Sequence, residues 1–247
     1  MIEVSGLTRR FRDRAAVSDL TFSIGKGEVV GLLGPNGAGK TTTLRLLTGA
    51  LPATSGTARV AGFDVFEQPM EARRRTGYLP EIPPLYDALT VRAQLRFAAG
   101  LKGIAPREAA AEVDRVAGLA GVAAVLERPT GNLSKGFRQR VGIAQALVGD
   151  PEVLILDEPT VGLDPIQIRE VRDLVRSLGG RHTVLLSSHL LPEVALTCTR
   201  VLVMNAGRLV GFDTLEALVA RHLPGRRVTV EDVAFLEEIF AKLVTPA

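Results

Sequence analysis

Hydrophobic and polar residues alternate along the first part of the chain. In IEV (residues 2–4) and LTFSI (residues 20–24), apolar side chains occupy every second position. Alternation with a period of two is typical of strands that bury one face against a core. The pattern predicts antiparallel strands between residues 2 and 28, ending at the turn GKGE.

Short apolar runs without alternation follow. These runs are VVGLL (residues 29–33), VLIL (residues 153–156) and TVLL (residues 183–186). Continuous runs predict strands that are buried on both faces, as in a parallel sheet. A glycine loop and a helix from about Gly39 to Gly49 follow the first run, and a hairpin over residues 201–212 closes the core.

The segment from residue 88 to residue 148 is rich in alanine and has a helical period. Thr90 is a candidate N-cap, Pro106 is a candidate helix start, and residues 128–132 contain the helix breakers proline and glycine. The last helix of the segment places four apolar residues on one face, namely Phe137, Val141, Ala144 and Val148. The segment is therefore predicted to be an inserted helical lobe.

Another helix is predicted after the second apolar run. Asp164 stands in the N-cap position before Pro165, and proline is favoured in the first turn of a helix. Its inward stripe consists of Ile168, Val171, Val175 and Leu178. Beyond residue 213, the pattern predicts two short helices on either side of residues 226–230, to which the sequence assigns no function.

The composition is that of a globular chain. With 247 residues and 46% hydrophobic content, it can bury a large core as one domain or as one domain with an inserted lobe. The single cysteine, Cys198, excludes an internal disulfide and fits a reducing compartment. We find no signal peptide and no apolar run long enough for a membrane helix, so we expect the chain itself to be soluble.

The net charge of +3 comes from arginines that are scattered along the chain. It permits nucleic-acid binding without implying it, and no nucleic-acid partner is expected. The densest basic stretches, residues 9–14 and 73–75, are either solvated surfaces or contacts to anionic lipid or to a partner.

The stretch GPNGAGKTT has the spacing G-x-x-x-x-G-K-[ST] of a phosphate-binding loop. In such a loop, backbone N–H groups converge on phosphate oxygens, the lysine binds the β- and γ-phosphates, and the hydroxyl binds Mg²⁺. A simple glycine turn is the alternative. The loop consists of Gly34, Pro35, Asn36, Gly37, Ala38, Gly39, Lys40, Thr41 and Thr42.

Two adjacent carboxylates, Asp157 and Glu158, end the buried strand at residues 153–156. Burying such a pair costs several kcal/mol unless a cation or strong donors compensate. Asp157 is therefore the expected Mg²⁺-side carboxylate of a P-loop ATPase, and Glu158 is placed as the general base for the attacking water. A helix-capping Asp-Glu pair is the alternative.

The phosphate loop and the carboxylate pair alone would allow many ATPases and GTPases. The segment LSKGFRQ (residues 133–139), upstream of Asp157, narrows this choice of protein class. With it, the chain resembles the nucleotide-binding subunit of an ABC transporter. The resemblance implies an α/β fold with a P-loop NTPase (RecA-like) core, an N-terminal antiparallel β subdomain and an inserted α-helical subdomain. It also implies an ATP-binding domain over residues 1–213 and a short extension over residues 214–247.

The resemblance assigns roles to further residues. Phe11 corresponds to the aromatic that stacks on adenine, although a core phenylalanine is the alternative. Glu81, in GYLPE, stands where most relatives have glutamine and would reach Mg²⁺ or water, although an exposed loop glutamate is the alternative. His189 corresponds to the histidine that contacts the γ-phosphate and orients the water, whereas His182 and His222 receive no role.

The signature segment departs from the usual form, because Lys135 replaces a glycine and Phe137 replaces a glutamine. Ser134 and Gly136, which would hold the γ-phosphate of the other subunit, are retained. Asp164 matches the loop that communicates across the dimer, and its capping role explains it equally well.

The resemblance implies two ATPase subunits, as a homodimer or heterodimer, which face each other head to tail around two ATP molecules with Mg²⁺. Hydrolysis would drive a separate integral membrane permease, with the chain at the cytoplasmic face of the membrane. With Lys135 and Glu81 at these positions, the motifs resemble those of exporter ATPases for drugs, lipids, polysaccharides or gliding-motility systems. A soluble ABC-type ATPase without a membrane partner and an importer ATPase are the alternatives.

Overall fold

The computed structural model describes residues 1–222, 238 and 241. The N-terminal part of the chain forms a four-stranded antiparallel sheet. Its strand order is β2-β1-β4-β5. These strands are β1 (Ile2–Phe11), β2 (Arg14–Ile24), β4 (Ser55–Val60) and β5 (Phe63–Asp64). The predicted antiparallel strands are confirmed but are longer than the alternating segments, because register shifts interrupt the alternation along β1.

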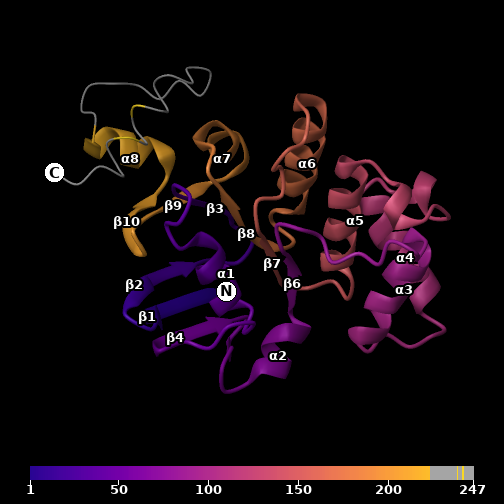
Figure 1. Cartoon of the computed structure of the whole chain (residues 1–247), viewed down its shortest axis with the longest axis horizontal. Helices are drawn as coiled ribbons and strands as arrows, with labels where there is room; N and C mark the ends of the chain where they lie inside the picture. The colour runs from indigo at the N-terminus through magenta and orange to yellow at the C-terminus, as the bar shows by residue number, and fades with distance from the viewer. Residues whose placement is uncertain (223–237, 239–240, 242–247) are drawn as a thin grey trace.

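A six-stranded sheet forms the second layer, in the order β10-β9-β3-β8-β7-β6 (Figure 1). All neighbouring strands are parallel except the terminal hairpin of β9 and β10. The strands are β3 (Val29–Leu33), β6 (Thr76–Leu79), β7 (Val153–Leu156), β8 (Thr183–Ser188), β9 (Arg200–Asn205) and β10 (Arg208–Asp213). Every residue of β3, β7 and β8 is buried, as their continuous apolar runs predict.

Successive residues of the parallel strands enter different halves of the core. Leu154 and Leu156 belong to the hydrophobic cluster that contains the helical segment, whereas Val153 and Ile155 pack with the antiparallel sheet and α1 (Lys40–Leu47). The six-stranded sheet is therefore covered on both faces, which leaves its strand ends as the place for polar chemistry.

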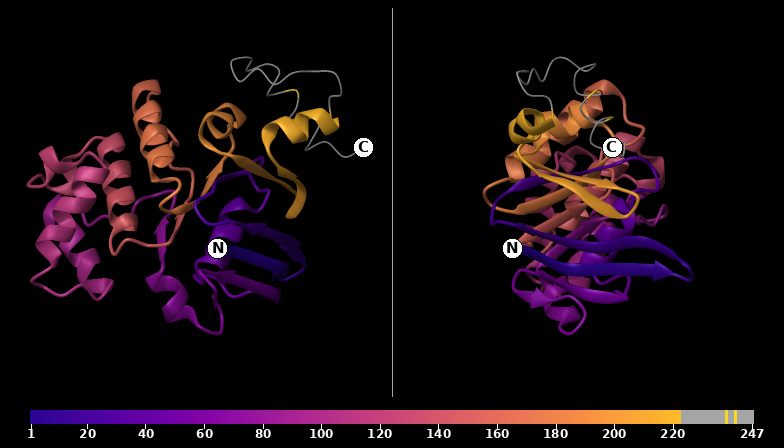
Figure 2. Two further views of the ribbon diagram at one scale, coloured as in Figure 1. Left: turned by 180° about the vertical axis from the view of Figure 1, so that it is seen from behind. Right: turned by 90° about the vertical axis from the view of Figure 1, so that its left-hand side faces the viewer.

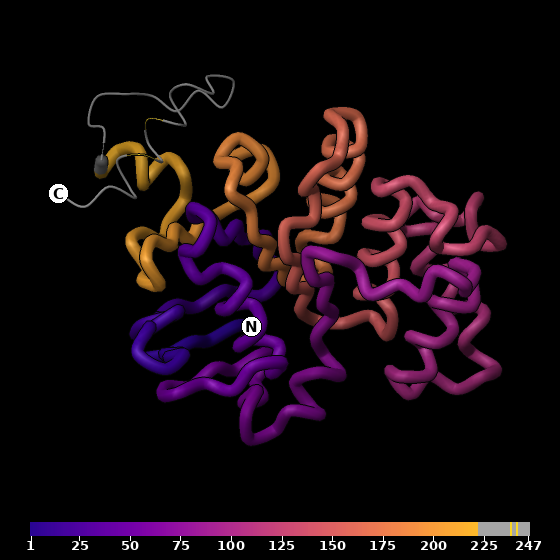
Figure 3. Tube along the Cα trace, in the orientation of Figure 1, coloured from indigo at the N-terminus to yellow at the C-terminus, as the bar shows by residue number. Residues whose placement is uncertain are grey.

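Three helices lie together at one end of the molecule, as Figure 1 and the reverse view in Figure 2 show. They are α3 (Val91–Leu101), α4 (Ala109–Leu119) and α5 (Lys135–Leu147). Figure 3 shows that the chain leaves the sheet after β6, forms these helices, and returns to it at β7. Thr90 caps α3 as predicted, whereas the predicted start of α4 at Pro106 is wrong because a turn over residues 105–108 precedes the helix.

The helical segment is tied to the sheet by Lys102 at the end of α3. Its Nζ donates to the carbonyl oxygens of Arg73 and Thr76, at 2.9 and 2.7 Å. Arg73 lies in α2 (Pro69–Arg74), which precedes β6. Burial lowers the pKa of Lys102 to about 8.

The other helices are α6 (Pro165–Leu178), α7 (Leu191–Thr197) and α8 (Leu215–His222). Helix α8 matches the first of the two predicted C-terminal helices. The predicted second helix and residues 226–230 lie outside the described residues, apart from residues 238 and 241. In the part of the chain that is described, no helix has both the length and the apolar content needed to cross a bilayer.

Candidate functional site

A cavity of about 660 Å³ opens beside the carboxyl ends of β3, β7 and β8. All residues of the predicted phosphate loop line it except Gly34 and Ala38, and so do Glu81, Glu158 and His189. Six residues that the sequence did not single out complete the lining, namely Arg14, Ala15, Ala16, Val161, Ala206 and Gly207.

The phosphate loop runs from β3 into the N-terminus of α1. Gly37 and Gly39 have φ values of 80° and 103°, in the left-handed region that favours glycine. At Gly39, a Cβ atom would also lie 2.5 Å from the Ala16 carbonyl oxygen. Glycine is therefore required at these positions by the backbone conformation and, at Gly39, by the close approach of Ala16. The loop also brings the N-terminus of α1 to the cavity, where its free N–H groups favour an anion.

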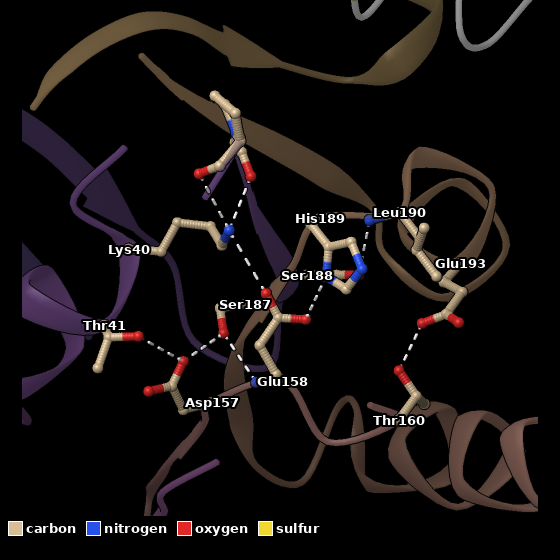
Figure 4. A network of polar contacts seen from close by, with 12 residues as sticks. Lys40, Thr41, Asp157, Glu158, Thr160, Ser187, Ser188, His189, Leu190 and Glu193 are labelled. Atoms are coloured by element: carbon tan, nitrogen blue, oxygen red, sulfur yellow. Dashed lines mark hydrogen bonds and ion pairs between the residues drawn. The ribbon is translucent and has the colours of Figure 1, made fainter. Parts of the chain in front are cut away.

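Lys40 is the first residue of α1 and is only 6% exposed. Its Nζ donates to the Gly34 carbonyl oxygen at 2.7 Å and lies 3.4 Å from Oε1 of Glu158. The other carboxylate oxygen of Glu158, Oε2, lies 2.9 Å from Nδ1 of His189 (Figure 4). The buried Glu158 carboxylate thus lies between a cation and a histidine at the edge of the cavity.

Asp157 lies beside this group, at the end of β7. Its Oδ1 accepts hydrogen bonds from the hydroxyls of Thr41, at 3.3 Å, and Ser187, at 2.7 Å. Its Oδ2 is buried, and within the described residues it has no hydrogen-bond partner. Burial raises the pKa of the nearby Tyr78 hydroxyl, and the Asp157 carboxylate adds to this shift.

Ser187 links the two acidic residues, because its Oγ also accepts the backbone N–H of Glu158 at 2.8 Å. Ser187 was not predicted from the sequence as a site residue. The available signal is the pair Ser187-Ser188, which ends an otherwise apolar buried strand directly before His189.

The backbone of Glu158 has a φ of 48°, which is unusual for a residue other than glycine. Such a conformation costs on the order of 1–3 kcal/mol and persists only where the surroundings enforce it. Here the enforcing contacts are the Ser187 hydroxyl at its N–H and the pairing of its carboxylate with Lys40 and His189.

Phe11 does not line the cavity. It ends β1, its side chain is 46% exposed, and the guanidinium of Arg9 lies over its ring at 4.6 Å. Residues 14–16, which follow it in the chain, line the cavity instead. Phe11 is thus an exposed ring next to the nucleotide-sized cavity rather than a core residue.

The signature residues lie at the N-terminus of α5, away from the cavity lining. Ser134 is the N-cap, and its Oγ accepts the N–H of Phe137 at 3.4 Å. Gly136 packs against α6, where a Cβ atom would lie 2.5 Å from Oε1 of Gln167. Asp164 caps α6 by accepting the N–H groups of Ile166 and Gln167 at 3.0 and 2.9 Å.

A parallel sheet with a glycine loop, a buried lysine and paired carboxylates at its strand ends defines a P-loop ATPase. The profile of the ABC transporter family matches residues 17–161, which is more than half of the chain. The chain therefore belongs to the ABC transporter family.

Two curated relatives illustrate the similarity. The ABC transporter ATP-binding protein NatA of Bacillus subtilis is 38% identical over 224 residues, which cover 88% of this chain and 91% of the relative. The bacitracin transport ATP-binding protein BcrA of Bacillus licheniformis is 38% identical over 228 residues, covering 90% of this chain and 74% of that protein.

A solved structure described as the ATP-binding subunit of an ABC transporter has a TM-score of 0.85 to this chain. It is 29% identical, and the match covers 98% of this chain and 99% of that structure. The predicted fold class is confirmed, and the chain is the ATP-binding, ATP-hydrolysing subunit of an ABC transporter.

Proposed function

We propose that this chain is the ATPase subunit of an exporter, which pairs with a second ATPase subunit around two ATP molecules and drives a separate membrane permease. The observation that carries the proposal is the placement of the Glu158 carboxylate between Lys40 and His189, beside the phosphate loop. This arrangement supplies a base, a phosphate-binding cation and an orienting histidine in one cavity.

Lys40 is held by protein groups that an incoming phosphate can replace. Its contacts are the Gly34 and Pro35 carbonyl oxygens and Glu158. When the β- and γ-phosphates of ATP enter the loop, Nζ turns to them and releases Glu158 to accept a proton from the attacking water. His189 then orients the water and contacts the γ-phosphate.

Thr41, Asp157 and Glu81 fit the Mg²⁺ that accompanies ATP. Asp157 accepts the Thr41 hydroxyl through Oδ1, and its buried Oδ2 has no hydrogen-bond partner among the described residues. Such oxygens are the ligands that Mg²⁺ favours. Within the described residues, no three acidic, histidine or cysteine side chains form a metal cluster. Such a site suits a cation that is bound mainly through phosphate oxygens and water, and Mg²⁺ supplies charge neutralisation there.

A second subunit is proposed because Ser134, Gly136 and Asp164 lie outside the cavity that their roles require. In a head-to-tail dimer, the N-terminus of α5 from one subunit faces the phosphate loop of the other. ATP then contributes binding energy to the closed state, and hydrolysis removes it. Phe11 is proposed to stack on the adenine at the outer end of the cavity.

The permease is proposed to bind across α2, α3 and the loop after Glu81. There, a groove of about 610 Å³ includes Met70 and Leu101, which are 60% and 74% exposed. Tyr86 and Phe97 form an exposed aromatic pair beside it, with ring centroids 5.7 Å apart. Exposed apolar surface of this kind is typical of protein interfaces.

The remaining proposals concern the domain bounds, the location of the chain and the direction of transport. Residues 1–213 are proposed to be the ATP-binding domain with its helical lobe at about 88–148, and residues 214–247 a short extension. The chain is proposed to lie at the cytoplasmic face of the membrane. The similarity to the Nod factor export ATP-binding protein I of Burkholderia orbicola supports export.

The test is to retrieve the tagged chain from native membranes in mild detergent and to identify what co-purifies. We expect an integral membrane protein in stoichiometric amount, whose transport of a solute out of sealed vesicles depends on ATP. Co-purification with ribosomes or DNA would favour a soluble ABC-type ATPase, and ATP-dependent uptake would favour an importer.

A further inference from the structure

Glu158 and His189 come from two separate segments of the chain. Glu158 begins the segment after β7, and His189 begins the segment after β8. Their contact involves a histidine side chain that is 39% exposed. Because water competes for the partly exposed imidazole, this contact alone does not fix the position of His189 relative to the buried Glu158 carboxylate. The alignment of the pair therefore depends on what else holds the two segments together.

A second polar contact joins the same two segments. The Thr160 hydroxyl donates to Oε2 of Glu193 at 2.5 Å, and both residues are partly buried (Figure 4). Thr160 is two residues after Glu158, and Glu193 lies in the first turn of α7, four residues after His189. Neither residue lines the nucleotide cavity.

Packing alone does not fix the spacing of the segments at this point. A largely apolar cavity of about 160 Å³ lies between α6 and α7, and Thr160 and Glu193 are part of its wall. A void leaves its lining without van der Waals partners, so the lining side chains do not define a single spacing. The Thr160–Glu193 hydrogen bond joins the two segments at the wall of this cavity.

Helix α7 packs closely against the six-stranded sheet. Val194 is fully buried, and it approaches β3 so closely that a Cβ atom at Gly31 would lie 2.3 Å from it. Glu193 is therefore attached to a fixed support. On the other side, Pro159 restricts the backbone between Thr160 and Glu158, so a displacement of Thr160 is passed to Glu158.

We propose that Thr160 and Glu193 are positioning residues that hold the Glu158 carboxylate in register with His189. The inference rests on the proposed function, in which Glu158 is the base. It predicts an effect on turnover without an effect on ATP binding, because the phosphate loop, which binds the nucleotide, is not part of the Thr160–Glu193 contact.

The test measures ATP turnover and equilibrium ATP binding for the full chain with Thr160→Val, Glu193→Ala, and both together. We expect each single variant to lower kcat about 10- to 100-fold, the range in which misplaced catalytic groups act, with KM and ATP affinity changed less than about two-fold. The double variant should be no slower than the singles, because each removes the same contact.

Two further variants separate positioning from general damage. Thr160→Ser keeps the hydroxyl and should restore at least half of the wild-type kcat. Thr197→Val is the matched control, because the Thr197 hydroxyl on the same helix donates to the backbone carbonyl oxygen of Glu193 rather than to its carboxylate. It should leave kcat near the wild-type value.

The inference is overturned if Thr160→Val raises KM while kcat is unchanged, if Thr160→Ser is as slow as Thr160→Val, or if the two losses multiply. Where Thr160→Val does not fold, Glu193→Ala provides the same comparison, because it removes the acceptor of the hydrogen bond. Glu158→Gln is measured beside them. If it hydrolyses ATP normally, the proposed function fails; if it is inactive while Thr160→Val is fully active, only this inference fails.

Discussion

Two regions of the molecule carry residues that are expected to contact phosphate, and these residues have different surroundings in the structure. At the strand ends of the core, Lys40, Asp157, Glu158 and His189 are brought from distant parts of the chain into one connected group. At the N-terminus of α5, Ser134 caps its own helix and is not among the residues that line the nucleotide cavity. One chain thus assembles one side of an ATP site, and under the proposed function the helical segment supplies the second side to another subunit.

The largest expected effect is at the base. Glu158→Gln keeps the shape of the side chain but removes its ability to accept a proton, so we expect ATP hydrolysis to fall at least about 100-fold. ATP should still bind, and the protein should accumulate as an ATP-bridged dimer. Phosphate release and light scattering after gel filtration measure both, and near-normal hydrolysis would contradict the role of Glu158.

The next effect is on nucleotide binding. Lys40→Ala removes the cation for the β- and γ-phosphates, and we expect the affinity for ATP to fall about 10- to 100-fold, as for the loss of a charge-assisted hydrogen bond. Equilibrium binding of a fluorescent ATP analogue measures it. Glu158→Gln is the control, because it alters the same buried pair without removing the cation, and equal affinities for the two variants would contradict the role of Lys40.

The helical region is tested by Ser134→Ala. We expect ATP binding by the isolated subunit to change less than about two-fold, while ATP-dependent dimerisation and turnover fall about ten-fold, since one charge-assisted hydrogen bond contributes about that much. Thr90→Ala is the matched control, because it removes an N-cap in the same helical segment. Both variants lose about 1 kcal/mol of stability, so equal turnover would show that Ser134 is only a cap.

The last prediction concerns the stability of the fold rather than ATP turnover, at the junction between the two regions. Lys102 has a pKa lowered from 10.5 to about 8 by burial, so the folded state disfavours its charge below pH 8. Between pH 8 and 10.5 the unfolded chain binds more protons than the folded chain. The stability of the wild type relative to Lys102→Met should therefore rise with pH over this range, by at most about 3 kcal/mol. Denaturant titrations across this range measure it, and a flat or falling difference would contradict a buried cation.

Much of the fold could be predicted from the sequence because it depends on local periodicity. The continuous apolar runs correctly predicted β3, β7 and β8, and the helical period predicted the α3–α5 segment. The start of α4 could not be predicted, because a proline favours a helix start and an isolated turn equally well. The full length of β1 was also missed, since bulges disrupt the alternation.

The sequence by itself determined the residue types of the site. Phosphate binding requires glycines that expose backbone N–H groups and a lysine at a fixed spacing, and hydrolysis requires carboxylates for Mg²⁺ and water. Only the tertiary structure decided which of them meet. It added Ser187 between Asp157 and Glu158, placed the Glu158 backbone in the left-handed region, and joined Thr160 to Glu193. These contacts link residues about thirty positions apart, and no local pattern encodes them, because they arise only when parallel strands bring their ends together.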